Sequence, residues 1–362
     1  MDLLHCLNCH QPYPDTGVPY RCPQCGGIFD YKIWPRVDFA PEDARLPGVW
    51  RYRRGFGLPP EAAPVSLGEG GTPLVWETFR GRRVALKCEY LNPTGSFKDR
   101  GMAVLVSFLR SRGVSAAVED SSGNAGAAFA AYAARGGVKA RVLVPDYAAG
   151  GKRRQIEMYG ADVTRILGAR SVVAEKARQV AAQGGVYASH AYLPFVLPGY
   201  ATLAYELVEQ MGGAPGAVLL PVGQGGLILG VGRGFWALQQ AGVIEKMPVL
   251  VGVQAEACAP LWALYAYGPA GLQWVTEGET VAEGVRIRHP VRGDGVLRIV
   301  SASGGAFVAV QEERILPARD QLAHRGFYVE PTSALPWAAL PEVLEHLPDP
   351  VVVILTGSGL KE

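Results

Sequence analysis

Residues 92 to 101 read Asn92-Pro93-Thr94-Gly95-Ser96-Phe97-Lys98-Asp99-Arg100-Gly101, a polar, turn-rich stretch that contains a single lysine. Its proline and glycine indicate a tight turn, and Ser96 is suited to cap the helix predicted over 102–112. Lys98 is therefore expected in the first turn of a helix, where the positive local field lowers the pKa of an amine. Such a lysine is a nucleophile toward carbonyl groups. The plain alternative is a surface lysine in a turn.

Two further stretches combine turn residues with a helix start. The first, Ser121-Ser122-Gly123-Asn124-Ala125-Gly126, lies between a short apolar run and a helix of small residues. The second, Pro221-Val222-Gly223-Gln224-Gly225-Gly226, ends the apolar strand predicted over 217–221. A strand, a glycine-rich loop and a helix start together form a cradle for an anion. Because Ile228 replaces the third glycine of a dinucleotide fingerprint, we interpret the second loop as a site for one small phosphate. The alternative is a plain β–α turn.

These segments resemble those of the fold type II pyridoxal-phosphate enzymes, and among them the threonine synthase group. The resemblance covers roughly residues 65 to 362 and rests on six motifs in the family's order: Gly68-Glu69-Gly70-Gly71-Thr72-Pro73-Leu74, the Lys98 segment, Ser122-Gly123-Asn124, Gly223 to Gly226, Glu330-Pro331-Thr332-Ser333-Ala334 and Leu355-Thr356-Gly357-Ser358-Gly359-Leu360-Lys361. It implies an α/β fold with two parallel-sheet, three-layer domains, similar to the tryptophan synthase β chain, and pyridoxal 5′-phosphate as the cofactor.

The resemblance also assigns the contacts of the cofactor. Lys98 would bind it covalently and move the α-proton of the substrate, and Asn124 would donate a hydrogen bond to its phenolic oxygen. Thr356 would place a hydroxyl at its pyridine nitrogen, which leaves that nitrogen largely unprotonated and favours loss of a β or γ group over transamination. Its phosphate would be held by the backbone N–H groups of Gly223, Gln224, Gly225 and Gly226, where missing side chains allow close approach.

The residues that would contact the substrate are less specific. Ser121 and Ser122 lie where family members bind the substrate carboxylate, although helix capping is an equal use for them. Glu283 is either part of a loop at the substrate or a solvated surface residue, and His190 either contacts the substrate or is structural. Threonine synthases that take phosphohomoserine usually carry an arginine in the region that corresponds to 189–200, and this stretch contains none.

Two alternatives for the substrate therefore stay open. One is phosphohomoserine, converted with water to threonine and phosphate. The other is a small β-hydroxy or β-substituted amino acid, as in a serine/threonine dehydratase or a β-replacing enzyme. A third interpretation, of another class, is a catalytically inactive zinc-ribbon binding protein, against which the intact set of cofactor residues argues.

A separate metal site is predicted at the N-terminus. The pairs Cys6-Leu7-Asn8-Cys9 and Cys22-Pro23-Gln24-Cys25 are separated by twelve residues, a spacing typical of four thiolates on one tetrahedral zinc. A unit as short as 1–35 cannot bury a core, so metal binding would supply its folding free energy. Two disulfides or four free thiols are the alternatives, and disulfides fit poorly with a cytoplasmic chain.

The remaining sequence bounds the class of protein. The 362 residues carry a net charge of +2 and are 49% hydrophobic, which gives no reason to expect a nucleic acid or a membrane as a partner. The N-terminus lacks the pattern of a signal peptide, so we expect a cytoplasmic location. The family resemblance implies a small amino-acid substrate and a homodimer. Helical and strand patterns alternate from 102 onward, which predicts parallel sheets. The expected divisions are a zinc ribbon at 1–35, a linker and the first part of the large domain at 36–95, a small α/β domain at 96–200 and the large cofactor domain at 201–362.

Overall fold

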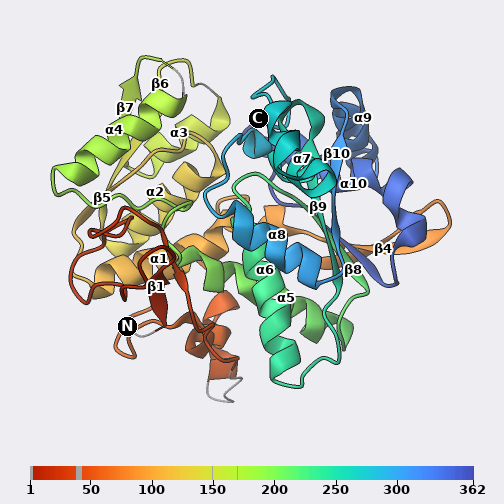
Figure 1. Ribbon diagram of the computed structural model, residues 1–362, viewed down its shortest axis with the longest axis horizontal. Coiled ribbons are helices and arrows are strands. Elements are labelled where there is room, and N and C mark those ends of the chain that lie inside the picture. The colour runs from red at the N-terminus through yellow and green to blue at the C-terminus, as the bar shows by residue number, and fades with distance from the viewer. Residues whose placement is uncertain (1–2, 38–42, 149, 169) are drawn as a thin grey trace. The chain divides into compact units, whose positions relative to one another are not determined.

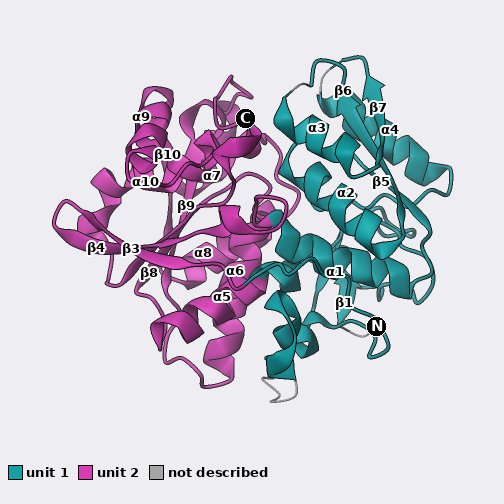
Figure 2. Ribbon diagram, turned by 180° about the vertical axis from the view of Figure 1, so that it is seen from behind, with its two compact units in different colours: residues 1–70, 98–200, 362 teal, residues 71–97, 201–361 magenta. Residues whose placement is uncertain are grey.

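The computed structural model describes residues 3–37, 43–148, 150–168 and 170–362. Contacts divide the chain into two compact units, drawn in different colours in Figure 2. Unit 1 comprises the residues up to Gly70, 98–200 and Glu362, and unit 2 comprises 71–97 and 201–361. The chain therefore passes from unit 2 into unit 1 between Phe97 and Lys98, within the polar segment 92–101.

Unit 2 is built on a six-stranded sheet in the order β10-β9-β8-β11-β4-β3. All neighbouring strands are parallel except β3, which runs antiparallel to β4 at one edge. The strands are β3 Leu74–Phe79, β4 Arg82–Lys87, β8 Ala217–Pro221, β9 Val249–Ala255, β10 Ala306–Val310 and β11 Val351–Ile354. The helices that accompany them are α5 Val196–Met211, α6 Gly226–Gln240, α7 Pro260–Tyr267, α8 Gly293–Ala302, α9 Glu312–Ala323 and α10 Pro331–Val343.

The core of unit 2 follows from its central strands. Every residue of β8 and β11 is buried, as expected for parallel strands covered on both faces by helices. Helix α10 is buried over most of its length, and its Trp337 meets Phe79 of β3 edge-on with ring centroids 4.9 Å apart. This apolar packing fixes the sheet, so the loops at the strand ends are held on a rigid frame.

Unit 1 contains a three-stranded parallel sheet in the order β5-β6-β7 (Figure 1). Its elements are α1 Lys98–Ser111, β5 Ala116–Glu119, α2 Asn124–Gly136, β6 Lys139–Pro145, α3 Gly151–Met158, β7 Asp162–Ile166 and α4 Arg170–Ala182. The strand predicted at 186–188 lies beside β5 but forms only an isolated bridge between Val118 and Tyr187. The predicted alternation of helices and strands, and the parallel sheets that it implies, are confirmed.

The N-terminal part of unit 1 is irregular. A short antiparallel pair joins β1 Leu4–Cys6 to β2 Phe29–Tyr31. Within the segment predicted as a linker, Gly48–Phe56 forms a 3₁₀ helix. Its aromatic residues Trp50, Tyr52 and Phe56 are at most 3% exposed. They bury the segment against its unit, and this apolar contact is stronger than the preference of the flanking prolines for extended backbone.

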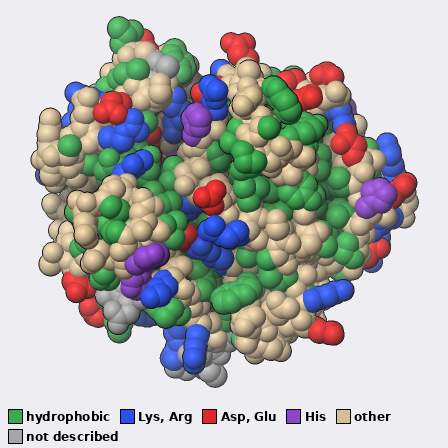
Figure 3. Space-filling model, viewed as in Figure 1, with side chains coloured by type: hydrophobic (Ala, Val, Ile, Leu, Met, Phe, Trp, Pro, Cys, Tyr) green, Lys and Arg blue, Asp and Glu red, His purple; other side chains and the backbone are tan. Residues whose placement is uncertain are grey.

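The described residues include no helix that is both long and apolar enough to cross a membrane. Positive and negative side chains are interspersed on the face shown in Figure 3, among apolar areas. A mixed surface of this kind agrees with the small net charge of the sequence.

Candidate active site

Three neighbouring strands of unit 2 bring the candidate cofactor residues to the C-terminal end of its sheet. Strands β8, β11 and β4 are adjacent and parallel. The glycine loop 223–226 follows β8, Thr356 follows β11, and the segment that leads to Lys98 follows β4. The carboxyl ends of parallel strands meet at a single edge, which is where open α/β sheets bind their ligands.

The segment before Lys98 is fixed against the end of β11 by backbone hydrogen bonds. Phe97 donates its N–H to the carbonyl oxygen of Thr356 over 3.0 Å, and Ser358 donates to the carbonyl of Gly95 over 2.9 Å. Lys98 then begins helix α1 as its first residue. The predicted position of Lys98 in the first turn of a helix is therefore confirmed. Thr356 lies beside Phe97, the residue that precedes this lysine.

The glycine loop has the shape of a cradle that side chains would fill. A Cβ on Gly225, whose φ is +81°, would lie 2.4 Å from a methyl carbon of Val296. A Cβ on Gly223 would lie 2.7 Å from the carbonyl oxygen of Gly284. Neither position therefore accepts a side chain, and helix α6 begins at Gly226 with its N–H groups directed toward the loop. A loop of this form fits a phosphate group.

Other residues around this loop are also held. The amide oxygen of Gln224 accepts a hydrogen bond from the N–H of Val291 over 3.1 Å, so its side chain is held by that partner. Glu283 is exposed, but the next residue packs against Gly223 and donates its N–H to the hydroxyl of Thr332 over 3.2 Å. The structure therefore places the Glu283 loop beside the glycine loop.

The hydroxyl of Thr356 is buried and oriented. Thr356 is 1% exposed, and its Oγ1 lies 2.9 Å from the Oγ of Ser333 on α10. Ser333 in turn accepts a hydrogen bond from the N–H of Gly357 over 2.7 Å. These contacts hold one hydroxyl at the edge of the sheet where a ring nitrogen would need a partner.

Unit 1 carries the remaining candidates at the end of β5. Helix α2 begins at Asn124, directly after Ser121, Ser122 and Gly123. The hydroxyl of Ser121 accepts a hydrogen bond from the N–H of Gly123 over 3.2 Å, which is a structural use of this side chain at the helix start. A Cβ on Gly126 would lie 1.8 Å from the carbonyl oxygen of Ser121, so the loop packs closely on its helix.

His190 has a partner that the sequence did not predict. Its Nδ1–H donates to a carboxylate oxygen of Glu119 over 2.6 Å, and the other oxygen accepts the N–H of Ser121 over 2.6 Å. Burial alone would raise the pKa of Glu119, but the histidine and the nearby Arg170 lower it below its ordinary value. Burial and the charge of Glu119 raise the pKa of the neighbouring Asp120. A carboxylate at the end of an otherwise apolar strand was the signal for this pair.

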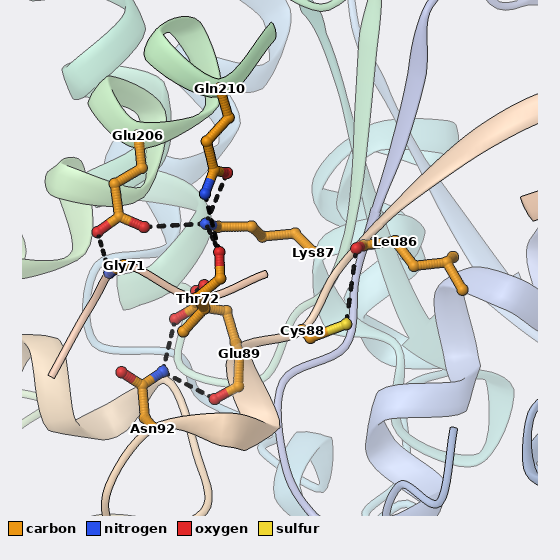
Figure 4. A network of polar contacts seen from close by, with 9 residues as sticks. All are labelled: Gly71, Thr72, Leu86, Lys87, Cys88, Glu89, Asn92, Glu206 and Gln210. Carbon is orange, nitrogen blue, oxygen red and sulfur yellow. Dashed lines mark hydrogen bonds and ion pairs between the residues drawn. The ribbon is translucent and has the colours of Figure 1, made fainter. Parts of the chain in front are cut away.

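A second buried network, shown in Figure 4, stabilises unit 2 near the Lys98 segment. The Nζ of Lys87, at the end of β4, donates to Glu206 over 2.9 Å, to Gln210 over 2.9 Å and to the carbonyl of Thr72 over 2.7 Å. The side chains of Lys87 and Glu206 are 0% and 4% exposed. Glu206 also accepts the N–H of Gly71 over 2.7 Å. The network fixes the last part of the glycine-rich motif, 71–74, between β4 and helix α5.

The four cysteines predicted to bind metal lie together. Their sulfur atoms are all within 4.8 Å of one another, and none of them forms a disulfide. Burial tends to raise the pKa of Cys6, but hydrogen bonds from the backbone of Cys9 and Asn8 lower it to about 7. A compact set of four thiols, one of which ionises readily, fits a tetrahedral zinc ion.

Comparisons with known proteins show the family to which the chain belongs. The family model for the pyridoxal-phosphate dependent enzyme matches residues 65–357. A threonine synthase of Methanocaldococcus jannaschii is 35% identical over 99% of this chain and 93% of its own length. One of Mycobacterium tuberculosis is 37% identical over 87% of this chain and 89% of its own length.

Solved structures show the same fold. A threonine deaminase from T.th. is 31% identical, with a TM-score of 0.67 over 79% of this chain and 92% of its own. Maize serine racemase, at 22% identity, has a TM-score of 0.69 over 80% of this chain and 88% of its own, which shows the fold alone. Because the family model matches most of its length and its relatives span nearly all of it, the chain belongs to the pyridoxal-phosphate dependent enzymes, with threonine synthases as its curated relatives.

Proposed function

We propose that the protein converts O-phosphohomoserine and water to threonine and phosphate, with pyridoxal 5′-phosphate held at Lys98. The observation that carries the proposal is the convergence of three loops, after β4, β8 and β11, at one edge of the unit 2 sheet. The threonine synthases among the relatives match 99% and 87% of the chain and supply the substrate class.

Each residue of the site has a distinct role in this reaction. When bound, the cofactor withdraws electrons from the α-carbon of an amino acid, which makes its α-proton acidic. Lys98 holds the cofactor and moves that proton, and Asn124 donates to the phenolic oxygen. The cradle of Gly223, Gln224, Gly225 and Gly226 binds the phosphate group through backbone N–H groups. The hydroxyl of Thr356, oriented by Ser333, meets the ring nitrogen and keeps it neutral.

Substrate recognition is assigned to three residues of unit 1 and to one loop of unit 2. We propose that the N–H groups and hydroxyls of Ser121 and Ser122 bind the substrate carboxylate, and that His190 approaches the substrate from its place on Glu119. Glu283 contributes from the loop beside the glycine cradle. The buried pair of His190 and Glu119 supports this assignment, because a fully buried carboxylate at the end of a strand needs a reason to be retained.

A second candidate substrate is a serine or threonine, deaminated by elimination of its hydroxyl. The observation that favours it is the absence of arginine from 189–200, because a buried phosphate normally recruits the fork of an arginine. The similarity to a threonine deaminase structure agrees with it. Of the cations near the other candidate loops, Lys152 pairs with Glu362 over 2.9 Å, and Arg286 donates to the carbonyl of Glu277 over 3.0 Å.

The two candidates are separated by one comparison of kcat/KM, on phosphohomoserine and on L-serine and L-threonine. The proposal expects phosphohomoserine to be preferred by about a hundredfold or more, which is ~2.7 kcal/mol of transition-state stabilisation. If α-keto acid is released from serine or threonine at an equal or higher kcat/KM, the protein acts as a serine/threonine dehydratase and the proposed conversion of phosphohomoserine is wrong.

We further propose that Cys6, Cys9, Cys22 and Cys25 bind one structural zinc ion. The support is the cluster of four sulfur atoms without a disulfide. Metal analysis of protein prepared without chelator is expected to give about one equivalent of zinc, because such sites bind tightly. A value below about half an equivalent would contradict it. Cysteines that form no disulfide also agree with the proposed cytoplasmic location. The homodimer is proposed on the family resemblance alone.

A further inference from the structure

The N-terminal ribbon, residues 3–35, packs against residues 186–200, which contain His190 and the first turn of helix α5 and are called the substrate loop. The ring of Tyr20 meets the rings of Tyr187 and Tyr192 edge-on, with centroids 5.2 and 5.3 Å apart. Arg21 donates to the hydroxyl of Tyr192 over 3.2 Å and lies 5.0 Å from the centre of its ring. The ribbon therefore holds the substrate loop on both sides of His190.

A second contact holds the far end of the same loop. The ring of Tyr13, 1% exposed, lies edge-on to Phe195 at 5.2 Å. Phe195 stacks on Phe108 of helix α1 with centroids 3.6 Å apart. Arg112, at the end of that helix, donates to the carbonyl of Pro14 over 3.1 Å. The ribbon, the substrate loop and the helix that begins at Lys98 thus form one aromatic cluster.

The substrate loop in turn contacts both candidate sites of unit 1. At its start, backbone hydrogen bonds of 2.8 Å join Val186 and Ala188 to Val118 of β5, one residue before Glu119. At its end, a Cβ on Gly199 would lie 2.1 Å from the carbonyl oxygen of Arg100, in the first turn of α1. A shift of the loop near Val186 and Ala188 would therefore displace His190, whereas the end of the loop is held by its close packing on the first turn of α1.

The ribbon residues that make these contacts are tied to the cysteine cluster. Tyr20 and Arg21 directly precede Cys22, and Arg21 also donates to the carbonyl of Gly26, next to Cys25, over 3.3 Å. A unit of this size has little core of its own, so the cysteine cluster sets the conformation of its turns. The state of the four sulfur atoms is thereby transmitted to the two side chains that hold Tyr187 and Tyr192.

We propose that the tetracysteine ribbon is a positioning element of the active site, which holds His190 in place through Tyr20 and Arg21. Metal binding at the ribbon then sets the affinity for the substrate, while the cofactor site in unit 2 is left unchanged. This inference rests on the proposed function for its effect on KM, but its structural part does not depend on the substrate.

The test compares Tyr20→Ala with Tyr20→Phe in the full-length protein loaded with cofactor and zinc. Hydrogen exchange is followed by mass spectrometry in the peptide that covers 186–195 and, as an internal reference, in β8 of unit 2. Two edge-on ring contacts of ordinary strength predict roughly tenfold faster exchange in 186–195 for Tyr20→Ala. Tyr20→Phe, which keeps the ring, should exchange like the parent. Removal of zinc by a chelator should act as Tyr20→Ala does, with β8 unchanged in each case.

Kinetics supply a second measurement. On the substrate that the protein turns over best, Tyr20→Ala is expected to raise KM about tenfold with kcat within about twofold of the parent, because a binding group moves and the cofactor does not. Arg21→Lys, which keeps the charge but loses the planar fork, should give a smaller change in the same direction. Unchanged exchange in 186–195, both in Tyr20→Ala and after zinc removal, would overturn the proposal. If no substrate is turned over, the proposed function fails while the exchange result still decides this inference.

Discussion

Phe97 donates its backbone N–H to the carbonyl oxygen of Thr356 over 3.0 Å, and this hydrogen bond joins the residue before Lys98 to the threonine that we propose as the partner of the ring nitrogen. Lys98 follows Phe97 directly, and the hydroxyl of Thr356 is fixed by Ser333. Together with the hydrogen bond from Ser358 to the carbonyl of Gly95, the bond from Phe97 couples the loop after β4 to the loop after β11. Changes at either loop are expected to alter the chemistry of the cofactor and not the stability of the sheet.

Thr356→Asp tests the hydroxyl at the ring nitrogen. A carboxylate there would stabilise the protonated form of the nitrogen, and a protonated ring would stabilise carbanions, so elimination should slow by about an order of magnitude or more and transamination should rise. The measurement is the ratio of the two products with the cofactor bound. Ser358→Ala, two residues further on, serves as the matched control and should leave that ratio unchanged. An unaltered ratio in Thr356→Asp, in protein that retains cofactor, would remove this threonine from the nitrogen.

The buried pair of Glu119 and His190 predicts a pH dependence of stability. The pKa of Glu119 is lowered in the folded protein from its ordinary value of 4.5. The ionised carboxylate of Glu119 therefore stabilises the fold above that pH, and the stabilisation is lost as the pH falls through the lower folded-state value. The difference in melting temperature between the parent and Glu119→Gln should be largest near pH 7 and shrink toward pH 4.

The control for that experiment is Glu175→Gln, which removes a surface carboxylate 54% exposed and paired with Arg178. Exposed pairs contribute little to stability, so its melting temperature should follow the parent at every pH. A difference between the parent and Glu119→Gln that grows on acidification would show that His190 does not stabilise the carboxylate. Asp120 acts in the opposite direction: burial raises its pKa in both proteins, and the charge of Glu119 raises it further only in the parent.

The network of Figure 4 predicts a large effect on the stability of unit 2. Lys87→Met leaves the carboxylate of Glu206, 4% exposed, without its cation, and the loss of one member of a buried ion pair costs about 3–5 kcal/mol. The urea midpoint followed by tryptophan fluorescence should fall accordingly. The double change Lys87→Met and Glu206→Leu should recover part of the loss, because no charge is then left buried. Additive effects of the two changes would mean that the side chains are independent.

These residues also show how far the sequence alone could be interpreted. The elements of the sheets follow from local periodicity, so β5, β7 and β8 have the predicted bounds. Lys98, Thr356 and the glycine loop are next to strands or helix starts, and their places follow from those elements. The partners of Lys87 and His190 do not follow from these elements. Glu206 is 119 residues from Lys87 along the chain, and Glu119 is 71 residues from His190. Periodicity carries no information on such pairs, although a charge inside an apolar strand signals that one exists.

The central claim is that Lys98 carries the cofactor, and borohydride reduction of the holoenzyme tests it most directly. Reduction fixes the cofactor to the amine that holds it, and peptide mapping by mass spectrometry then identifies the lysine. The account predicts one pyridoxyl group, on Lys98, and its loss together with the cofactor absorbance in Lys98→Ala. The internal controls are Lys87, held in its buried network, and Lys361, which donates to the carbonyl of Thr94 over 2.7 Å. A label on either of these, or an equally coloured and reducible Lys98→Ala, would contradict the account.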